Sequence, residues 1–383
     1  MKRLVLAGGG HAHLHVLQSL ARKKWLDGGL AGGLDVVLVT PHARQVYSGM
    51  LPGWIAGHYR LDECVAPLQP LVDAAGVRFV RDHVIGLDPQ RRILRCAAAD
   101  DIPYDVLSLD IGAEIDLSTL AATTAPLLSI RPIERFIVDW SRALESCIHA
   151  GRARIAVVGG GAAGVELALA MRYRLLKDLR ADAVEVLLIE GRRLLNGHGK
   201  TVVSRVGKAL GKHGVASISS YAAGGEGGVL FPDGRRFDAD IVVAATGSAA
   251  PRWLAGTDLA LAQDGFVAVG AGQQSVSHAN VFAAGDIASR VDRPHAKSGV
   301  YAVRAGPVLA ENLRRTLNGQ APLSYVPQRR SLYLLATGPQ QAIASWNGWT
   351  TEGHWVWRWK DWIDRRFMKQ YAPADGGMRG GME

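Results

Sequence analysis

The chain has 383 residues, which is too many for one hydrophobic core of ordinary size, so its length predicts two or three domains. Hydrophobic residues make up 48% and charged residues 21%, as is usual for globular proteins, and no apolar run reaches the roughly eighteen residues that a membrane span requires. The formal net charge is +9, yet no run of Lys and Arg resembles a nucleic-acid-binding tail, so nucleic acid is not expected as a partner.

The three cysteines, Cys64, Cys96 and Cys147, lie far apart in the sequence and form no CxxC or CxxxxC pair. A local redox disulfide and a zinc knuckle are therefore excluded. Three separate buried thiols are expected, with a bridge between two distant cysteines as the alternative. This cysteine usage suits a reducing, cytoplasmic compartment.

The chain begins with a strand, a glycine-rich turn, a helix and a second strand. Apolar residues 3–7 predict a buried strand, the turn occupies 8–13, the helix extends to about residue 24, and the second strand covers 35–39. Such a unit has parallel strands and a helix N-terminus that can bind phosphate. The turn is imperfect, because His13 stands where a third glycine is expected and Thr40 where a ribose-binding acid is expected. The Thr40 hydroxyl is still able to hydrogen-bond a ribose.

Shorter elements follow the first unit. Residues 44–57 combine Tyr, Ser, Met, Pro and Trp with glycines and predict a loop. Residues 77–88 and 92–96 predict short strands, and 104–111 predict a further strand that ends at Gly112.

The same architecture recurs about 150 residues later. A strand at 154–158 leads into a turn with the full spacing Gly159, Gly161 and Gly164, and a helix at 165–179 and a strand at 184–189 follow. In a dinucleotide fold these glycines permit the tight turn, the approach of the pyrophosphate and the close packing of helix on strand. Glu190 ends the last strand, where a carboxylate binds a ribose hydroxyl and favours NADH. Arg192 and Arg193 leave NADPH open, because they are able to receive a 2′-phosphate.

Three further patterns complete the chain. A strand at 240–244 leads into Ala-Thr-Gly at 245–247, and a strand at 280–284 leads into Gly285-Asp286. Residues 299–317 predict a helix. The composition changes after residue 322, and six of the ten tryptophans lie between 346 and 362, which predicts a small third region.

Together, the two turns, Ala-Thr-Gly and Phe282-Ala-Ala-Gly-Asp286 resemble the FAD-dependent pyridine nucleotide-disulfide oxidoreductase superfamily. The segments 8–13, 47–52, 297–304 and 355–368 are similar to one subgroup, which is often fused in front of selenophosphate synthetase and is itself similar to type II NADH dehydrogenases and sulfide:quinone reductases. In that subgroup His13 and Thr40 are ordinary residues. Without a synthetase domain after it in this sequence, the chain is expected to stand alone.

The resemblance implies an α/β fold with two Rossmann-like domains, one for FAD and one for NAD(P)H, and a small C-terminal region. It places a discontinuous FAD-binding domain at 1–115 and 256–325, an NAD(P)H-binding domain at 116–255, and the C-terminal region with its Trp-rich helix at 326–383. The implied FAD contacts are Gly8, Gly10, His11, His13, Thr40, Tyr47, Ser48, Gly112, Gly285 and Asp286, with Asp286 on the ribityl–pyrophosphate part. The implied NAD(P)H contacts are Gly159, Gly161, Gly164, Glu190, Thr246 and Gly247.

Two residues are candidate catalytic groups. Lys297 lies eleven residues after Asp286, where relatives carry a lysine near the isoalloxazine ring that stabilises reduced flavin; the alternative is a surface lysine. Glu166 follows the inner turn, where relatives have a glutamate that faces the nicotinamide; the alternative is an acid favoured by the helix dipole. No metal site is expected, because the histidines of the outer turn lie where a phosphate binds.

The last predicted helix has two interpretations. Apolar residues recur at helical spacing in this segment, at Trp355, Trp359, Trp362, Ile363 and Phe367. Its basic residues outnumber its acidic ones, with Arg358, Lys360, Arg365, Arg366 and Lys369 against Asp361 and Asp364. Aromatic and basic residues together suit a membrane interface, and packing on the protein's own body or on a partner subunit is the alternative.

The resemblance and the missing redox cysteine pair predict an FAD-dependent NAD(P)H dehydrogenase that passes hydride to flavin and electrons to a quinone-like small molecule. The enzyme is expected in the cytoplasm, peripherally on the inner face of the membrane. The alternatives are a sulfur- or selenium-related flavin reductase that uses Cys64, and a flavin-binding regulatory protein with little turnover. The sequence does not decide whether the electron donor is NADH or NADPH. It also leaves the oligomeric state open, and a homodimer is one of the alternatives.

Overall fold

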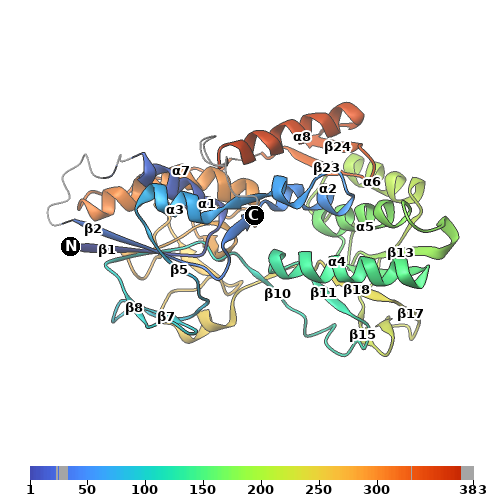
Figure 1. Cartoon of the computed structure of the whole chain (residues 1–383), viewed down its shortest axis with the longest axis horizontal. Coiled ribbons are helices and arrows are strands. Elements are labelled where there is room, and N and C mark those ends of the chain that lie inside the picture. The colour runs from blue at the N-terminus through green and yellow to red at the C-terminus, as the bar shows by residue number, and fades with distance from the viewer. Residues whose placement is uncertain (23–24, 26–32, 329, 372–383) are drawn as a thin grey trace, which may run out of the picture.

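The computed structural model describes residues 1–22, 25, 33–328 and 330–371. Two five-stranded parallel sheets with helices packed against them form its centre, which confirms the predicted α/β class with two Rossmann-like units (Figure 1). The first sheet has the order β21-β9-β1-β2-β5. Its strands are β1 (Lys2–Ala7), β2 (Leu34–Val39), β5 (Arg78–Val80), β9 (Val106–Leu109) and β21 (Val281–Ala283).

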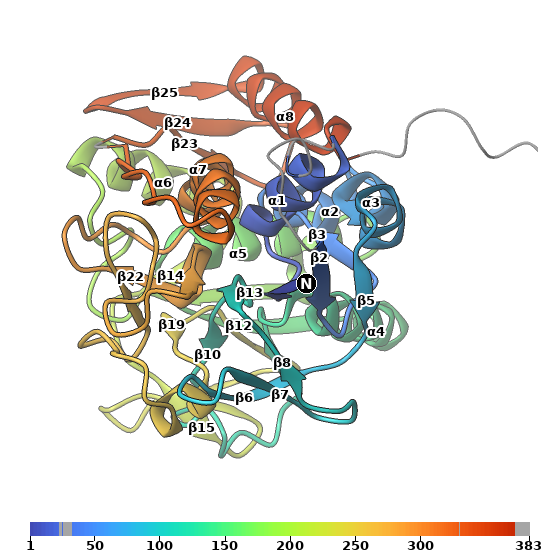
Figure 2. The ribbon, with the colours of Figure 1, turned by 90° about the vertical axis from the view of Figure 1, so that its left-hand side faces the viewer.

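The strands of the first sheet are apolar on both faces because both faces are covered. Leu4 and Leu6 of β1 pack toward the helices α1 (His11–Ala21), α3 (Leu68–Ala75) and α7 (Gly299–Leu317), which lie side by side in Figure 2. Val5 and Ala7 point to the opposite face. Small sheets cover that face, formed by β6 (Val84–Asp88), β7 (Ile93–Cys96) and β8 (Ile102–Pro103), and by β20 (Val267–Val269) and β22 (Ala288–Arg290).

The second sheet has the order β11-β18-β12-β13-β14. Its strands are β11 (Leu127–Ser129), β12 (Ala153–Val158), β13 (Val184–Ile189), β14 (Val215–Ile218) and β18 (Ile241–Ala244). The helices α4 (Ile133–Ala150), α5 (Ala162–Leu175) and α6 (Lys200–Lys212) pack on it. A three-stranded sheet of β15 (Ala223–Gly225), β16 (Gly228–Leu230) and β17 (Arg236–Asp238) covers its other face.

The first sheet takes strands from residues 1–115 and from 256–325, whereas the second takes them from 116–255 alone. A short antiparallel pair, β10 (Glu114–Ile115) with β19 (Ser248–Ala249), joins the two crossing segments between the halves. The predicted domain boundaries stay a prediction.

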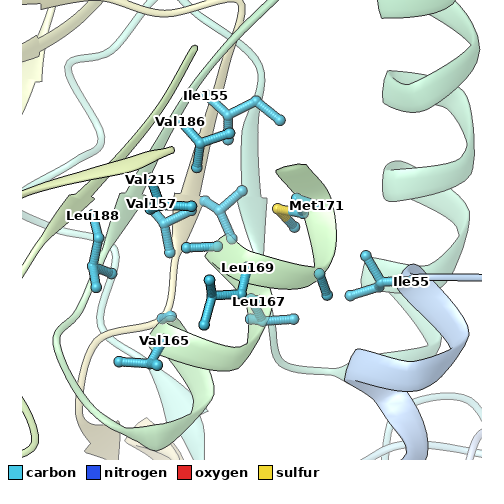
Figure 3. Packing of buried hydrophobic residues seen from close by; sticks show 14 of the residues in the cluster. Ile55, Ile155, Val157, Val165, Leu167, Leu169, Met171, Val186, Leu188 and Val215 are labelled. Atoms are coloured by element: carbon cyan, nitrogen blue, oxygen red, sulfur yellow. The ribbon is translucent and has the colours of Figure 1, made fainter. Parts of the chain in front are cut away.

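The prediction of a loop at residues 44–57 is wrong. The segment forms β3 (Arg44–Val46), which pairs with β4 (Val65–Pro67), a 3₁₀ turn at Ser48–Met50, and the short helix α2 (Leu51–Ile55). Pro52 lies in the first turn of α2, where its fixed φ is compatible with a helix. Ile55 of α2 packs against α5 of the second half (Figure 3), so this segment joins the hydrophobic cores of both halves.

The C-terminal region is a three-stranded antiparallel sheet followed by a helix. Its elements are β23 (Tyr333–Ala336), β24 (Ala342–Trp346), β25 (Trp349–Gly353) and α8 (His354–Lys369). Asn347 and Gly348, with φ of 51° and 84°, form the two-residue hairpin turn between β24 and β25. Figure 1 shows α8 lying across the helices of both halves.

Of the predicted apolar stripe of α8, Phe367 is buried, whereas the rest of the buried face is formed by other residues. Val356, Lys360, Asp364 and Phe367 are buried against the body, whereas Trp355 and Trp362 are 52% and 56% exposed. The helix therefore packs on its own body through one face and presents tryptophans on another. Among the described residues, no helix is long and apolar enough to cross a membrane.

We expect the two faces of α8 to respond differently to truncation. Phe367→Ala removes a buried ring that contacts Tyr47 and should lower the free energy of unfolding by about 3–5 kcal/mol. Trp362→Ala on the exposed face should lower it by less than about 1 kcal/mol. Urea unfolding of both variants measures the difference, and equal losses would contradict this orientation of α8.

Candidate functional site

The inner glycine turn joins β12 to α5, and each of its motif glycines has its own spatial reason. Gly159 has a φ of +134°, and a Cβ there would overlap the carbonyl group of Ala245. A Cβ on Gly164 would overlap the carbonyl oxygen of Gly159. Nothing lies within 4 Å of the place where Gly161 would carry its Cβ, so the N-terminus of α5 is open to a ligand there.

Three other predicted NAD(P)H residues lie around this opening. Thr246 follows β18, and its hydroxyl is buried without a hydrogen-bond partner in the described part of the chain. No atom lies within 4 Å of the missing Cβ of Gly247. Glu190 follows β13 and accepts a hydrogen bond from the Ser219 hydroxyl at 2.6 Å. The structure thus brings all six predicted residues to the carboxyl edge of the second sheet.

In the outer turn, His13 fits where the pattern expects glycine because its ring makes two hydrogen bonds. Its Nδ1–H donates to the carbonyl oxygen of Gly8 at 2.6 Å. Nε2 accepts from the Ser108 hydroxyl at 2.8 Å. The side chain is fully buried, and burial lowers the pKa of His13 to about 4, so the ring is neutral. Both ring nitrogens form hydrogen bonds within the protein, and His13 therefore stabilises the turn by connecting it to β9.

The N-terminus of α1 is capped by a residue that the sequence analysis did not single out. Gly10 offers no side-chain cap, and the backbone N–H groups of Ala12 and His13 donate to Asp110 Oδ2 at 2.8 and 3.0 Å. Asp110 directly follows β9. An acid at the end of an apolar strand, two residues before Gly112, was the available signal, but the glycine pattern contains no acid at this position.

Asp286 lies in a 3₁₀ turn after β21, next to Gly285, whose φ is +69°. Arg131 Nη2 donates to Asp286 Oδ2 at 2.6 Å, and a Cβ on Gly112 would lie 4.0 Å from Arg131 Nη1. Arg131 stands 155 residues before Asp286, in the segment that enters the second half, and no sequence motif indicates this pair.

Aromatic side chains surround the start of α1. The ring centroids of His11 and Tyr47 are 5.6 Å apart, and those of Tyr47 and Phe367 are 4.5 Å apart. Burial and the neighbouring Asp364 raise the pKa of Tyr47 well above its ordinary value. A Cβ on Gly299 would lie 3.6 Å from Ser48 Oγ, so Ser48 faces the N-terminus of α7.

Lys297 is held by its own neighbours in the structure. Its Nζ donates to Ala288 O and Ser289 Oγ, each at 3.0 Å, and lies 3.5 Å from Asp264 Oδ2. Nζ also lies 3.5 Å from the ring centroid of Phe266. A role of Lys297 beside the flavin stays a prediction.

Glu166 points toward the C-terminal region. The backbone N–H of Ala336 in β23 donates to Glu166 Oε1 at 2.8 Å. Burial raises the pKa of Glu166 to about 7, although Lys360 of α8 lowers it in part. Lys360 itself is buried, and its Nζ donates to Asp364 Oδ2 and to Gly49 O, both at 2.6 Å. In the sequence, Lys360 and Asp364 read as two charges of an amphipathic helix, and their i, i+4 spacing is the signal that could have indicated a pair.

Buried polar atoms test whether the two cradles fit dinucleotides. In the described part of the chain, His11 Nε2, Ser298 Oγ and Thr246 Oγ1 are buried without a hydrogen-bond partner. His11 and Ser298 begin α1 and α7 beside the outer turn, and Thr246 borders the inner turn. Thr40 follows β2 and lies against Gly9, at the edge where an adenosine ribose is expected. Orphaned donors and acceptors at both turns fit the binding of a polar ligand at each.

Comparison with known proteins gives a consistent result. The family model described as pyridine nucleotide-disulphide oxidoreductase matches residues 2–306. NADH dehydrogenase-like protein YutJ of Bacillus subtilis is 24% identical over 335 residues, which cover 86% of this chain and 87% of that protein. Demethylphylloquinone reductase NdbB of Synechocystis is 27% identical over 189 residues, which cover 48% of this chain and 46% of that protein.

Two solved structures have a similar fold. The sulfide:quinone oxidoreductase of Aquifex aeolicus superposes with a TM-score of 0.79 at 16% identity and covers 97% of this chain and 91% of that chain. NDH2 of Plasmodium falciparum in complex with NADH has a TM-score of 0.78 at 13% identity and covers 97% and 98%.

The inner turn predicts a separation between binding and stability. Gly161→Ala places a methyl group in the open space and should weaken NAD(P)H binding at least about tenfold, while the free energy of unfolding changes by about 1 kcal/mol or less. Gly164→Ala should cost about 1–3 kcal/mol or more, because its methyl group overlaps the Gly159 carbonyl.

Gly207→Ala, at an open and exposed position inside α6, is the matched control. It should leave NADH binding unchanged and raise the free energy of unfolding by about 0.5–1 kcal/mol, because alanine has the higher helix propensity. Fluorescence titration with NADH and thermal unfolding measure the two effects. Unchanged NADH binding in Gly161→Ala would show that the ligand does not approach this turn.

Proposed function

Because this chain belongs to the pyridine nucleotide-disulphide oxidoreductase family and is an FAD-dependent NAD(P)H oxidoreductase, we propose that it delivers electrons to a quinone at a membrane surface. The observation that carries the proposal is the position of Glu166. This acid lies in the first turns of α5, two residues after the last glycine of the inner turn. It interacts with Lys360 of α8, the helix that bears the exposed tryptophans. It therefore links the nicotinamide half to the helix whose outer face would meet a lipophilic acceptor.

FAD, when bound, supplies the two-electron centre that accepts hydride from NAD(P)H and passes electrons onward. In our proposal the outer turn, Thr40, Ser48, Ser298 and Asp286 hold FAD, and the inner turn with Glu190 and Thr246 holds NAD(P)H. The third glycine position of each turn, filled by His13 or by Gly164, fixes the helix whose N-terminus faces the phosphates.

Reduction of a quinone to a quinol consumes two protons as well as two electrons, so the site requires a proton donor. A carboxyl group with a pKa of about 7, raised by burial, exchanges protons near neutral pH. We assign this role to Glu166, with Oε1 held by the Ala336 amide. Lys360 positions the carboxyl and is in turn held by Asp364.

The outward face of the C-terminal region suits a membrane interface. Trp346 and Trp349 on the β24–β25 hairpin and Trp355 and Trp362 on α8 are each at least half exposed. The side chain of Arg366 lies over the Trp362 ring at 5.2 Å, and Arg358 and Lys369 are exposed nearby. Tryptophans with basic neighbours bind the headgroup region of anionic bilayers.

The two alternatives have less physical support. Cys64 is buried beneath Met50 and Tyr59, and burial raises the pKa of its thiol to about 12, so a reactive thiolate is not populated near neutral pH. A regulatory flavoprotein with little turnover does not require a neutral-range proton donor beside its nicotinamide turn.

Anaerobic reduction tests the proposed electron path. NADH or NADPH should bleach the yellow holoenzyme, and a soluble quinone should reoxidise it faster than polysulfide or selenium species do. Glu166→Gln keeps an acceptor for the Ala336 amide but carries no exchangeable acid proton, so quinone reoxidation should slow about 100-fold while bleaching changes little.

Cys64→Ser is the matched variant for the sulfur alternative and should retain quinone reduction. A holoenzyme that neither nicotinamide bleaches would remove the dehydrogenase function, and preferential reoxidation by polysulfide would remove the quinone proposal.

Vesicle sedimentation tests the membrane surface. Removal of residues 355–383 would also delete the buried face of α8, so point variants are required. Trp362→Ser combined with Arg366→Gln should lower partitioning into phosphatidylcholine–phosphatidylglycerol vesicles by about tenfold. Ile85→Ser combined with Arg91→Gln changes an exposed pair in β6 and in the turn before β7, and should not alter partitioning. Figure 2 shows β6 and β7 on the side of the molecule away from α8. Equal partitioning of both double variants would remove the membrane proposal.

A further inference from the structure

Asp110 places a carboxyl group inside the glycine cradle of the outer turn. It follows β9, is 4% exposed, and accepts the backbone N–H groups of Ala12 and His13 through Oδ2. Its carbonyl oxygen also accepts the backbone N–H of Gly10 at 3.2 Å. Asp110 therefore accepts hydrogen bonds from three of the backbone amides at the N-terminus of α1.

The other carboxyl oxygen, Oδ1, faces the cradle. No described residue donates a hydrogen bond to it. A Cβ on Gly10 would lie 2.5 Å from Oδ1, and a Cβ on Gly285 would lie 2.6 Å from it. These glycines belong to the two motifs that border the expected pyrophosphate position, so Oδ1 lies between the elements that hold the cofactor.

The charged and titratable groups around Asp110 come from four elements. Asp286 in the turn after β21 adds a second carboxylate, and Arg131 from the linker before α4 is bonded to Asp286. Lys297, in the segment before α7, interacts electrostatically with Asp286. His11 and His13 on α1 are neutral near pH 7, because burial lowers the pKa of each to about 4. No cation contacts Asp110 itself in the described residues.

We propose that Asp110 binds the pyrophosphate of FAD as the neutral acid, with its Oδ1–H donating a hydrogen bond to a phosphate oxygen, so that FAD binding to protein with an ionised Asp110 takes up one proton. An ionised Asp110 would instead present an acceptor and a negative charge to a group that already carries two charges. The proton comes from solvent and returns to solvent when FAD leaves. The proposal concerns the resident cofactor and does not depend on the identity of the acceptor.

The surroundings of Asp110 favour the neutral form in advance. Burial raises the pKa of Asp110 to about 7, and Asp286 adds to this rise, although the amides of Ala12 and His13 oppose it. An anionic phosphate nearby would raise the pKa further. The affinity for FAD should therefore be constant below about pH 7 and fall above it by up to about tenfold for each pH unit.

Dissociation of FAD from the full-length holoenzyme, measured from the fluorescence of released flavin at equilibrium, tests this linkage. The dissociation constant of the wild type should rise between about pH 7 and 9. In Asp110→Asn the amide still accepts the α1 N–H groups and donates toward the phosphate, so its dissociation constant should be pH-independent and close to that of the wild type at low pH.

Asp105→Asn is the matched control, because Asp105 lies at the opposite end of β9 and binds the backbone N–H of Arg3. This variant should keep the pH dependence of the wild type. Dissociation constants of Asp110→Asn that rise with pH as steeply as those of the wild type would overturn the proposal, and so would a wild type without pH dependence.

A measurement on the wild type alone avoids any effect of substitution on folding. FAD-depleted protein is titrated with FAD by calorimetry at about pH 8 in two buffers of different ionisation enthalpy. The difference between the two enthalpies should correspond to an uptake of nearly one proton for each FAD bound. An uptake of zero would show that Asp110 only caps α1.

Discussion

Both nucleotide-binding halves depend on one steric constraint, the carbonyl group of the first glycine in each turn lying against the first turn of the following helix. In the inner turn the Gly159 carbonyl leaves no room for any side chain at residue 164. In the outer turn the Gly8 carbonyl meets the His13 ring and accepts its Nδ1–H. The second solution replaces close packing with a hydrogen bond, and it requires a further donor for Nε2, which Ser108 provides.

This second solution explains the polar residues of β9. Side chains two residues apart in a strand point to the same face, so Ser108 and Asp110 face the helices together with Val106, whereas Leu107 and Leu109 pack on the other face. One strand therefore supplies both the support for His13 and the cap for α1. A Cβ at residue 8, 10 or 285 would overlap atoms of Asp110. These three glycines therefore leave room for the aspartate as well as for a ligand.

The periodicity of apolar residues predicted the main strands and helices, because these elements are long and bury regular faces. It did not predict α2, a helix of five residues. A helix this short is not stable by itself, and α2 is stabilised by its packing on α5. Nor did it predict the buried face of α8, where Lys360 and Asp364 neutralise each other while tryptophans remain outside. The pair of Arg131 and Asp286 spans 155 residues, and no local pattern contains information about such a contact.

The two cradles differ in charge although they share a fold. At the inner turn the N-terminus of α5 is open at Gly161, and its orphan amides and dipole attract the phosphates without opposition. At the outer turn a carboxyl group occupies the corresponding amides of α1, and an ionised carboxylate would cancel an attraction of only about 0.3–1 kcal/mol. The outer cradle therefore attracts an anion when Asp110 is neutral. A nucleotide that enters and leaves in each turnover suits the open cradle, whereas a resident cofactor suits a cradle whose neutral acid becomes part of the binding site.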